Sequence, residues 1–314
     1  MDKPGGRALR KSLRTDFSPS LRLRLIRAAF RAKQARRVPS LLLGGELTRP
    51  VFIVGAPRSG TSLLYAILRT SMHFDHWPGE AHEVWEADYH PALRGWESNV
   101  LDAGDLRPDA ARRIRRAFFL AAGRRRRLLD KTPRNCFRIP FVDALFPDAC
   151  FVFLQRDGRE NINSLINAWR TPRYRTYRLP QPHRIPGVDP SWWKFVLYPG
   201  WRADSNGPLE VVSARQWQLS NDHALRGLRA LPGDRWTRIR YEDLVAHPAE
   251  EVGRLTQSLG VAYDEDVAAR AVAIASTPIN TVTPPERGKW KRENPAEIEA
   301  VLPLIDETMS ALGY

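Results

Sequence analysis

The feature that most constrains the fold of this chain is a short apolar run that leads directly into a glycine-containing turn. Residues Val51–Val54 read VFIV, which is typical of a strand buried in a parallel sheet. The turn Gly55–Ser62 reads GAPRSGTS, and the apolar spacing after it predicts a helix over residues 59–72. A strand, a tight turn and a helix in immediate succession form the repeating unit of α/β proteins, so this segment predicts an α/β fold.

The same succession recurs twice further along the chain. Residues 151–154 are predicted to form a second buried strand with a helix over 158–169, and residues 236–240 a third strand with a helix over 241–259. Because parallel strands need crossover connections, we expect a single domain over 46–314, with a central parallel β-sheet flanked by helices. Helical spacing predicts three further helices, at 108–122, 210–231 and 295–312.

Two segments lie outside this pattern. Residues 1–45 are predicted to form a basic N-terminal arm with an amphipathic helix over 21–37, which would either pack on the domain or contact an anionic membrane surface. Between 170 and 208 the periodicity fails, and Pro, Arg, Tyr and Trp crowd together. We expect a stretch without regular structure there, either facing a binding site or forming a surface insertion.

Charge and cysteine content limit the class of protein. The chain has 49 Lys and Arg against 35 Asp and Glu, a net charge of +14, and only seven of the cations are Lys. Arginine suits bidentate binding of phosphate and sulfate, so anionic ligands are expected. No apolar stretch approaches the ~20 residues of a membrane span. Two cysteines cannot form a disulfide framework, so we expect a cytoplasmic protein.

The turn at 55–62 has the position of a phosphate-binding loop but lacks the lysine of that loop. In proteins that bind nucleoside triphosphates the pattern ends Gly-Lys-Ser/Thr, with the lysine on the terminal phosphates and the hydroxyl on magnesium. Here Thr61 follows Gly60 directly, and Arg58 is the only cation of the turn. The backbone N–H groups and the helix N-terminus still favour an anion. The loop therefore favours a sulfate donor over ATP.

The segment Pro57–Thr61 resembles the loop of the sulfotransferase family that grips the 5′-phosphosulfate of 3′-phosphoadenylyl sulfate. The resemblance implies a P-loop NTPase-like sulfotransferase fold and this nucleotide as co-substrate. In the family an Arg at a strand end and a Ser on the next helix hold the 3′-phosphate, and Arg156 and Ser164 stand at that separation. The donor-binding residues implied in this part of the chain are Pro57, Arg58, Ser59, Gly60, Thr61, Ser62, Arg156 and Ser164.

Two later segments extend the resemblance. Tyr241 opens a stretch similar to the family's Tyr-Glu-Asp-Leu. The run Lys289-Trp290-Lys291 is similar to the Gly-x-Trp-Lys region, whose cations reach the 3′-phosphate and whose Trp lies near the adenine. A lysine stands on each side of Trp290, so the resemblance does not decide which of Lys289 and Lys291 has that role.

The resemblance also implies catalytic roles. Sulfuryl transfer needs cations at the sulfuryl and bridging oxygens and a base for the acceptor proton. Arg58 is one implied cation, and Lys131 is the other, because its segment resembles the Lys-Asp-Pro stretch of the tyrosylprotein-type members. The alternative is a surface lysine beside a turn.

The base is expected in the segment Pro78–Glu86. Glu80 follows a glycine, as in the Gly-Glu-Glu of the tyrosylprotein-type branch, and is the first candidate. The next position is Ala, so Glu83 and His82 stay open as candidates. The run from His82 departs from the zinc-protease pattern at its fifth position, and no metal site is expected.

These observations together predict an enzyme that moves a sulfuryl group to a hydroxyl or amine without a metal. The acceptor stays open among small molecules, glycans, lipids and peptides, with 170–208 on the acceptor side. No specific nucleic acid is expected, whereas an oligomer and peripheral membrane contact through 21–37 are compatible with the sequence. The alternatives are a P-loop kinase of a small molecule and a non-enzymatic protein that binds nucleic acid or membrane surfaces through basic clusters such as Arg124–Arg127.

Overall fold

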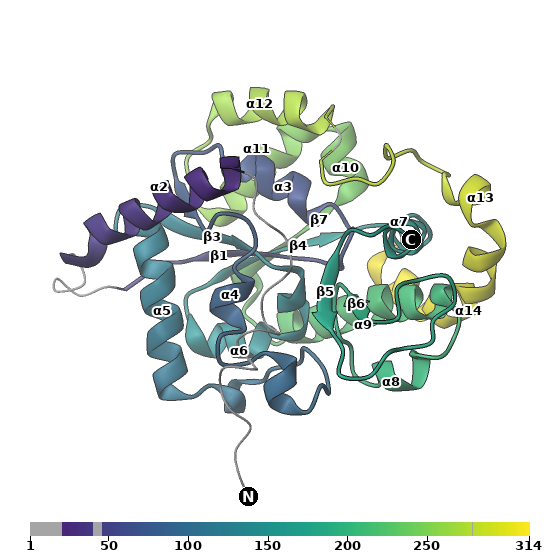
Figure 1. Ribbon diagram of the computed structural model, residues 1–314. Helices are drawn as coiled ribbons and strands as arrows, with labels where there is room; N and C mark the ends of the chain where they lie inside the picture. The colour runs from purple at the N-terminus through teal and green to yellow at the C-terminus, as the bar shows by residue number, and fades with distance from the viewer. Residues whose placement is uncertain (1–20, 40–45, 278) are drawn as a thin grey trace, which may run out of the picture.

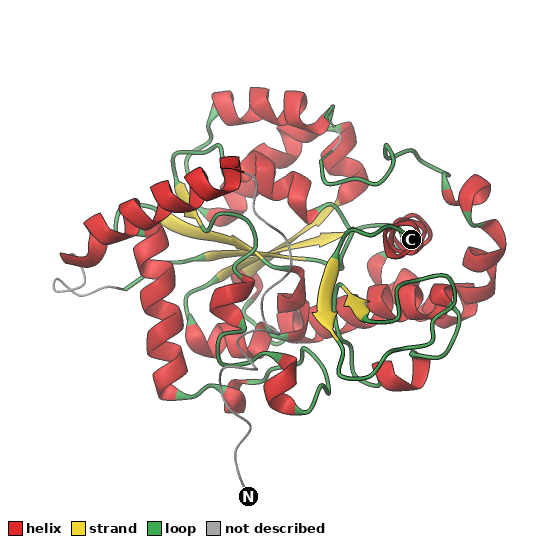
Figure 2. Ribbon diagram, in the orientation of Figure 1, coloured by secondary structure: helices red, strands yellow, loops and turns green. Residues whose placement is uncertain are grey.

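The computed structural model describes residues 21–39, 46–277 and 279–314, and the N-terminal part of the predicted arm, 1–20, lies outside them. Five parallel strands form a central sheet in the order β2-β3-β1-β4-β7, with helices on both faces (Figure 1 and Figure 2). The expected α/β fold, a single domain around a parallel sheet, is confirmed. The strands are β1 (Val51–Val54), β2 (Phe74–His76), β3 (Arg127–Lys131), β4 (Cys150–Gln155) and β7 (Trp236–Arg240).

Helices make up most of the rest of the described chain. Several predicted helices are found within one or two residues of their expected ends. The helices are α2 (Leu21–Arg37), α3 (Thr61–Leu68), α4 (His82–Trp85), α5 (Pro108–Ala122), α6 (Ile139–Leu145), α7 (Gly158–Arg170), α8 (Trp201–Asp204), α9 (Leu209–Arg229), α10 (Tyr241–Ala246), α11 (Pro248–Leu259), α12 (Glu265–Ala275), α13 (Trp290–Glu293) and α14 (Pro295–Leu312).

Each face of the sheet carries its own hydrophobic core. Successive side chains of a strand point to opposite faces. In β1, Phe52 and Val54 belong to the core shared with α5, α9 and α14, whereas Val51 and Ile53 belong to the core shared with α3, α11 and α12. All four side chains are fully buried. A strand covered on both faces needs a continuous apolar run, which is why VFIV could be recognised from the sequence.

The order of the strands determines where a ligand can bind. The chain runs from β1 to β2 and β3 on one side, and then to β4 and β7 on the other. In open α/β sheets, ligands bind beyond the carboxyl ends of the strands where the order reverses in this way. The loops after β1 and β4 therefore flank the expected binding position.

The segment 170–208 is not the structureless stretch that we expected. It contains an antiparallel hairpin of β5 (Arg175–Arg178) and β6 (Trp192–Lys194), followed by α8. Tyr177 and Trp193 are almost fully buried in the core beneath it. The aromatic residues that obscured the periodicity therefore attach the hairpin to the domain.

Two predicted helices also differ from the structure. The helix expected over 241–259 is two helices, because His247 is non-helical before Pro248, as the ring of a proline demands of the residue that precedes it. The helix expected over 59–72 is shorter and spans Thr61–Leu68, after which the chain turns into β2.

The expected helix over 21–37 is present as α2 and packs on the domain. Lys33 and Arg37 each form an ion pair with Asp75 at 2.6 Å, and Phe30 meets Trp77 edge-on at 4.9 Å between ring centroids. Packing on the domain was one of the two roles considered for this helix. Among the described helices, none has both the length and the apolar character needed to cross a membrane.

Candidate active site

A cavity of about 930 Å³ opens beyond the carboxyl ends of the central strands. Its walls come from the loops after β1, β4 and β7, from the hairpin, and from a strap formed by residues 275–286, of which 278 is not described. Most of the residues singled out from the sequence line it, namely Pro57, Arg58, Gly60, Thr61, Ser62, Glu80, His82, Glu83, Arg156, Ser164, Tyr241 and Lys289.

The phosphate-loop segment has the backbone geometry of an anion cradle. Gly60 has φ 106°, and a Cβ added there would lie 2.3 Å from the ring of Tyr241. Only glycine fits this position, since the left-handed region and the close ring both exclude a side chain. Arg58 also has positive φ, at 71°. Backbone strain of this kind is concentrated at ligand sites.

Asn161 of α7 braces the loop and was missed by the sequence analysis. In the amide orientation that satisfies both groups, its nitrogen donates to Pro57 O at 2.9 Å and its oxygen accepts from Ser59 N at 3.1 Å. The side chain is fully buried. Its position three residues after the start of a predicted helix carries no local signal, so only the tertiary structure identifies it.

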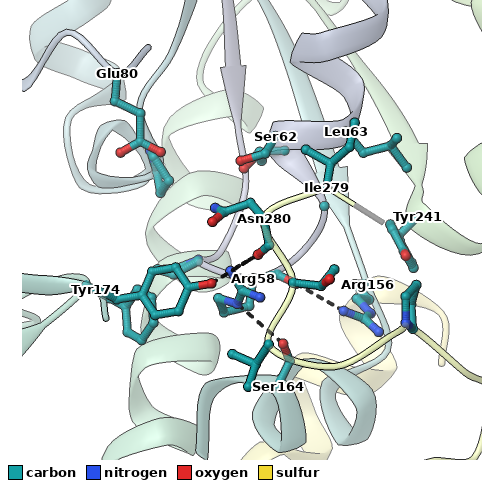
Figure 3. Close-up of a pocket in the computed structure, with 18 of the residues that line it drawn as sticks. Arg58, Ser62, Leu63, Glu80, Arg156, Ser164, Tyr174, Tyr241, Ile279 and Asn280 are labelled. Atoms are coloured by element: carbon teal, nitrogen blue, oxygen red, sulfur yellow. Dashed lines mark hydrogen bonds between the residues drawn. The ribbon is translucent and has the colours of Figure 1, made fainter. Parts of the chain in front are cut away.

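The cations expected to hold the donor lie together. Arg156 donates through Nη1 to Arg58 O at 3.1 Å, and its guanidinium lies 4.5 Å from the ring centroid of Tyr241. Arg58 Nε donates to Ser164 Oγ at 3.3 Å, so the loop cation and the serine expected at the 3′-phosphate are neighbours (Figure 3). Asp157 pairs with Arg159 at 2.6 Å rather than with Arg156. The Arg156 guanidinium is therefore not engaged by its sequence neighbour Asp157.

Glu80 lies at the other side of the cavity (Figure 3). Two partners hold its carboxylate. Lys131 Nζ donates to Glu80 Oε1 and to Ser62 Oγ, the second at 3.2 Å, and His82 Nε2 bonds Glu80 Oε2. Burial would raise the pKa of the Glu80 carboxyl, but Lys131 and His82 hold it well below its usual range. Lys131 is buried at the end of β3 and is not the surface residue that was considered as its alternative. Glu83 lines the cavity but is exposed.

A buried ionic cluster next to the cavity was also missed. Glu86 accepts from Arg134 Nη1 at 2.6 Å, from Arg138 Nη2 at 2.9 Å and from the Tyr177 hydroxyl at 2.7 Å. Burial acts to raise the pKa of Glu86, but the two guanidinium groups hold it well below its usual range. This cluster ties the hairpin to the segment that carries Glu80.

The strap crosses the cavity and is bonded to the phosphate loop. Asn280 O accepts from Arg58 Nη1 at 2.7 Å and from the Tyr174 hydroxyl at 3.1 Å (Figure 3). Lys289, beyond the strap, donates to Pro284 O at 2.8 Å and lines the cavity. Trp290 instead packs against the core, and Lys291 is exposed beside it. Of the two lysines left open by the sequence, Lys289 is therefore the one that reaches the cavity.

No group of three or more His, Cys, Asp or Glu side chains is placed to hold a metal ion within residues 21–39, 46–277 and 279–314.

A comparison with protein families identifies the domain. The profile of the sulfotransferase family matches residues 50–185 and 191–265, which includes the phosphate loop, the strands, and most of the hairpin segment. The segment 170–208, which lies outside the strand–helix pattern of the sequence, is thus largely part of the family match.

Individual relatives are distant. The chain is 24% identical over 289 residues to the protein-tyrosine sulfotransferase of Drosophila melanogaster, covering 84% of this chain and 51% of that protein. It is 28% identical over 229 residues to the nodulation protein NoeE of Sinorhizobium fredii, covering 68% and 50%. The chain therefore spans about half the length of the curated relatives it matches.

Solved structures show the same fold at low identity. A sulfotransferase from Mycobacterium avium superposes with a TM-score of 0.53 at 15% identity, covering 95% of this chain and 87% of that one. The sulfotransferase domain of an olefin synthase from Synechococcus PCC 7002 gives 0.50 at 20% identity, covering 84% and 95%. Both bear on the fold alone.

Proposed function

Since this chain belongs to the sulfotransferase family, we propose that it transfers a sulfuryl group from 3′-phosphoadenylyl sulfate to an acceptor hydroxyl or amine. One observation carries the proposal. The cavity joins an anion cradle without a P-loop lysine to a carboxylate that is paired with a buried lysine. The first part suits a phosphosulfate, and the second supplies the base and cation that sulfuryl transfer needs.

The residues present fit the donor. Arg156 Nε and Ser59 Oγ are buried without a hydrogen-bond partner among the described residues, and buried polar atoms of this kind are normally paired. Arg156, Ser164 and Lys289 would bind the 3′-phosphate through charge-assisted hydrogen bonds. The backbone of 57–62 would receive the 5′-phosphosulfate at the start of α3, where the N–H groups of a helix are free to bind an anion.

The contacts support a role for each of these residues in the transfer. The acceptor oxygen forms a bond to sulfur while the bond from sulfur to the bridging oxygen breaks, and adenosine 3′,5′-bisphosphate leaves. Lys131, in contact with Ser62 of the cradle, would neutralise charge on the transferred group together with Arg58. Glu80, whose depressed pKa keeps it ionised at neutral pH, would accept the acceptor proton.

Glu80 is our choice of base over Glu83 because of its contact with Lys131. A base and a cation in contact with each other can act on the same reaction, the base on the acceptor proton and the cation on the transferred group. Glu83 also lines the cavity, but none of the bonds described above joins it to Lys131 or to the cradle. The roles of Glu80, Glu83 and His82 stay predictions until they are measured.

The acceptor class is proposed from the relatives. Several are named as protein-tyrosine sulfotransferases, so a phenolic hydroxyl is the first acceptor to test, on a peptide or on a small molecule. The hairpin residues Tyr174, Thr176 and Phe195 line the cavity. They would contact the acceptor, in keeping with the acceptor-side position expected for 170–208.

The test is transfer of ³⁵S from labelled 3′-phosphoadenylyl sulfate to a panel that contains a tyrosine peptide, 4-nitrophenol, an oligosaccharide and a hydroxylated lipid. We expect labelled product with at least one member, and none when ATP labelled at its γ-phosphate replaces the donor. Calorimetry should show tighter binding of adenosine 3′,5′-bisphosphate than of 5′-AMP. Equal affinities, or phosphoryl transfer from ATP, would contradict the proposal.

A further inference from the structure

The carboxylate of Glu80 is held by two donors of different kinds. Lys131 binds Oε1 and His82 binds Oε2, so each oxygen has its own partner. The side chain of Lys131 is 6% exposed, whereas those of Glu80 and His82 are 30% and 31% exposed. The lysine therefore approaches from the protein interior, and the histidine lies beside Glu80 on the cavity wall.

The surroundings of His82 favour a neutral imidazole with its proton on Nε2. Its Nδ1 is buried and has no hydrogen-bond partner among the described residues. Burial and the nearby guanidinium of Arg134 lower the pKa of His82, while the carboxylates of Glu80 and Glu86 oppose that shift only in part. A neutral imidazole with one hydrogen donates it to the acceptor that it faces. Here that acceptor is Glu80 Oε2.

During the proposed transfer, Lys131 has to stabilise negative charge in two places, on Glu80 and on the sulfuryl group. Its Nζ also contacts Ser62 Oγ in the cradle, where the sulfuryl group would lie under the proposed function. As negative charge develops there, the ammonium would turn toward it and its contact with Oε1 would weaken. Without a second partner, the carboxylate would then be free to rotate away from the acceptor.

We propose that His82 is a positioning residue, whose neutral imidazole holds Glu80 by Oε2 while Lys131 turns to the sulfuryl group. This inference rests on the proposed function and assigns His82 a role other than that of base. A neutral donor keeps the carboxylate in place without adding a positive charge. The pKa of Glu80 would therefore rise toward its usual range as Lys131 leaves, so the base becomes stronger when it is needed.

Three substitutions separate positioning from proton transfer. In His82→Gln the amide nitrogen reaches the place of Nε2, in His82→Asn it reaches only the place of Nδ1, and His82→Ala has no donor. Neither amide can act as a base at neutral pH. We expect turnover to fall about 10²-fold in the Ala and Asn variants, as for a misplaced catalytic group, and to stay within a few fold of the native rate in Gln. The KM for the donor should be unchanged in all three.

A titration that needs no acceptor gives the second readout. The ¹³C carboxyl signal of Glu80, assigned by its loss in Glu80→Gln, is followed against pH with adenosine 3′,5′-bisphosphate bound. In the native protein and in His82→Gln the signal should stay that of a carboxylate down to the lowest pH at which the fold persists, whereas in His82→Ala and His82→Asn protonation of Glu80 should begin at higher pH. The same Gln and Asn changes at the exposed His247, which does not line the cavity, are the matched controls and should alter neither readout.

The outcomes separate this inference from the proposed function. Equal loss of turnover in Gln and Ala would show that imidazole itself moves the proton, and would overturn the positioning role. Equal behaviour of Gln and Asn, or an unchanged Glu80 pKa in His82→Ala, would also overturn it. If native protein transfers no sulfuryl group to any acceptor, the proposed function fails and the inference fails with it, even where the titration follows the expected pattern.

Discussion

At the scale of single residues, Asp130 is expected to make the free energy of unfolding depend on pH. Its side chain is 1% exposed and accepts from the Trp85 indole at 3.1 Å and from Asn135 Nδ2 at 3.2 Å. Burial raises the pKa of Asp130 from 3.8 to about 7, against the effect of the hydrogen bonds from Trp85 and Thr132. The folded state therefore holds a proton that the unfolded chain releases above about pH 4.

The prediction follows from the sign of that shift. As pH rises from about 4 to about 7, the unfolded chain loses its proton first, so the free energy of unfolding should fall by up to about 1.4 kcal/mol per pH unit from this residue. Asp130→Asn keeps the shape and lacks the proton, so it should remove this part of the slope. Urea unfolding of both proteins at pH 5, 6 and 7 measures it. If the free energy of unfolding changes with pH in the same way in both proteins, Asp130 is already ionised in the folded state.

Arg156 gives a second prediction at this scale. If it binds the 3′-phosphate, Arg156→Ala should weaken binding of adenosine 3′,5′-bisphosphate by about 10- to 100-fold, the value of one charge-assisted contact. Binding of 5′-AMP, which has no 3′-phosphate, should change little. Arg159→Ala is the control, since Arg159 pairs with Asp157 at the surface and does not line the cavity. An equal loss for both nucleotides would indicate a general role in the loop.

At the scale of elements, the hydroxyl group of Tyr177 joins the hairpin of β5 and β6 to two buried polar side chains. Tyr177 donates to Glu86 Oε1 and accepts from Asn99 Nδ2, both at 2.7 Å. Tyr177→Phe removes both bonds and leaves a buried carboxylate with one donor fewer. We expect a loss of about 1.5–3 kcal/mol in the free energy of unfolding. Tyr263→Phe, at a side chain that is 55% exposed, should change it by less than about 0.5 kcal/mol.

A loss in Tyr177→Phe no larger than in Tyr263→Phe would mean that apolar packing and the bonds of Lys194 to the carbonyls of Ala168 and Trp169 hold the hairpin without the hydroxyl. Chemical denaturation measures both variants. Sulfuryl transfer by Tyr177→Phe then tests whether the hairpin must be fixed for the acceptor to bind.

The elements that could be predicted are those whose signal is local. The strand Val51–Val54 and the helix Pro108–Ala122 were found because burial on both faces, or on one stripe, leaves a continuous apolar pattern. The edge strand Phe74–His76 is three residues long, and Arg127–Lys131 has charged residues at both ends. Their charges are stabilised by groups far away in the sequence, as Asp75 is by Lys33 and Arg37, so no local pattern marks them as strands.

The residues of the candidate site also fall into two groups, those that a local motif predicts and those that no local motif marks. The cradle and its neighbours Arg156 and Glu80 were named in advance because their motifs are contiguous in sequence. The residues that fix them, Asn161 and Glu86, act through partners up to about a hundred positions away. Such long-range contacts exist only in the folded chain. They determine which of the predicted residues lie close together in the site.

At the scale of the whole molecule, α2 packs beside the segment that leads to Glu80. It contacts the region where β2 ends through Phe30, which lies on Trp77, and through two cations that pair with Asp75. The Trp77 carbonyl accepts from the Tyr65 hydroxyl at 2.7 Å, which ties the same segment to α3. Three residues later the chain reaches Glu80. The packing of α2 is therefore linked through a short backbone path to the proposed base.

Asp75→Asn tests this link. The amide keeps the volume of the side chain but removes the charge that Lys33 and Arg37 share, so α2 should detach more often while the sheet stays folded. We expect hydrogen exchange to accelerate about tenfold or more in 28–37 and to stay unchanged in β1 and β4, since one charged hydrogen bond is worth about that factor. Asp109→Asn, at an exposed ion pair on α5, is the control.

The activity of Asp75→Asn shows whether the packing of α2 also affects the position of Glu80. If α2 helps to hold the segment before Glu80, turnover should fall in Asp75→Asn while the affinity for adenosine 3′,5′-bisphosphate stays the same, because the donor side of the cavity has no contact with α2 among those described. Faster exchange with native turnover would limit α2 to a packing role. Exchange that stays slow would mean that the Phe30 contact and the bonds of Arg37 to the Leu120 and Ala121 carbonyls hold the helix without the ion pairs. Asp75 would then serve only to neutralise the cations around it.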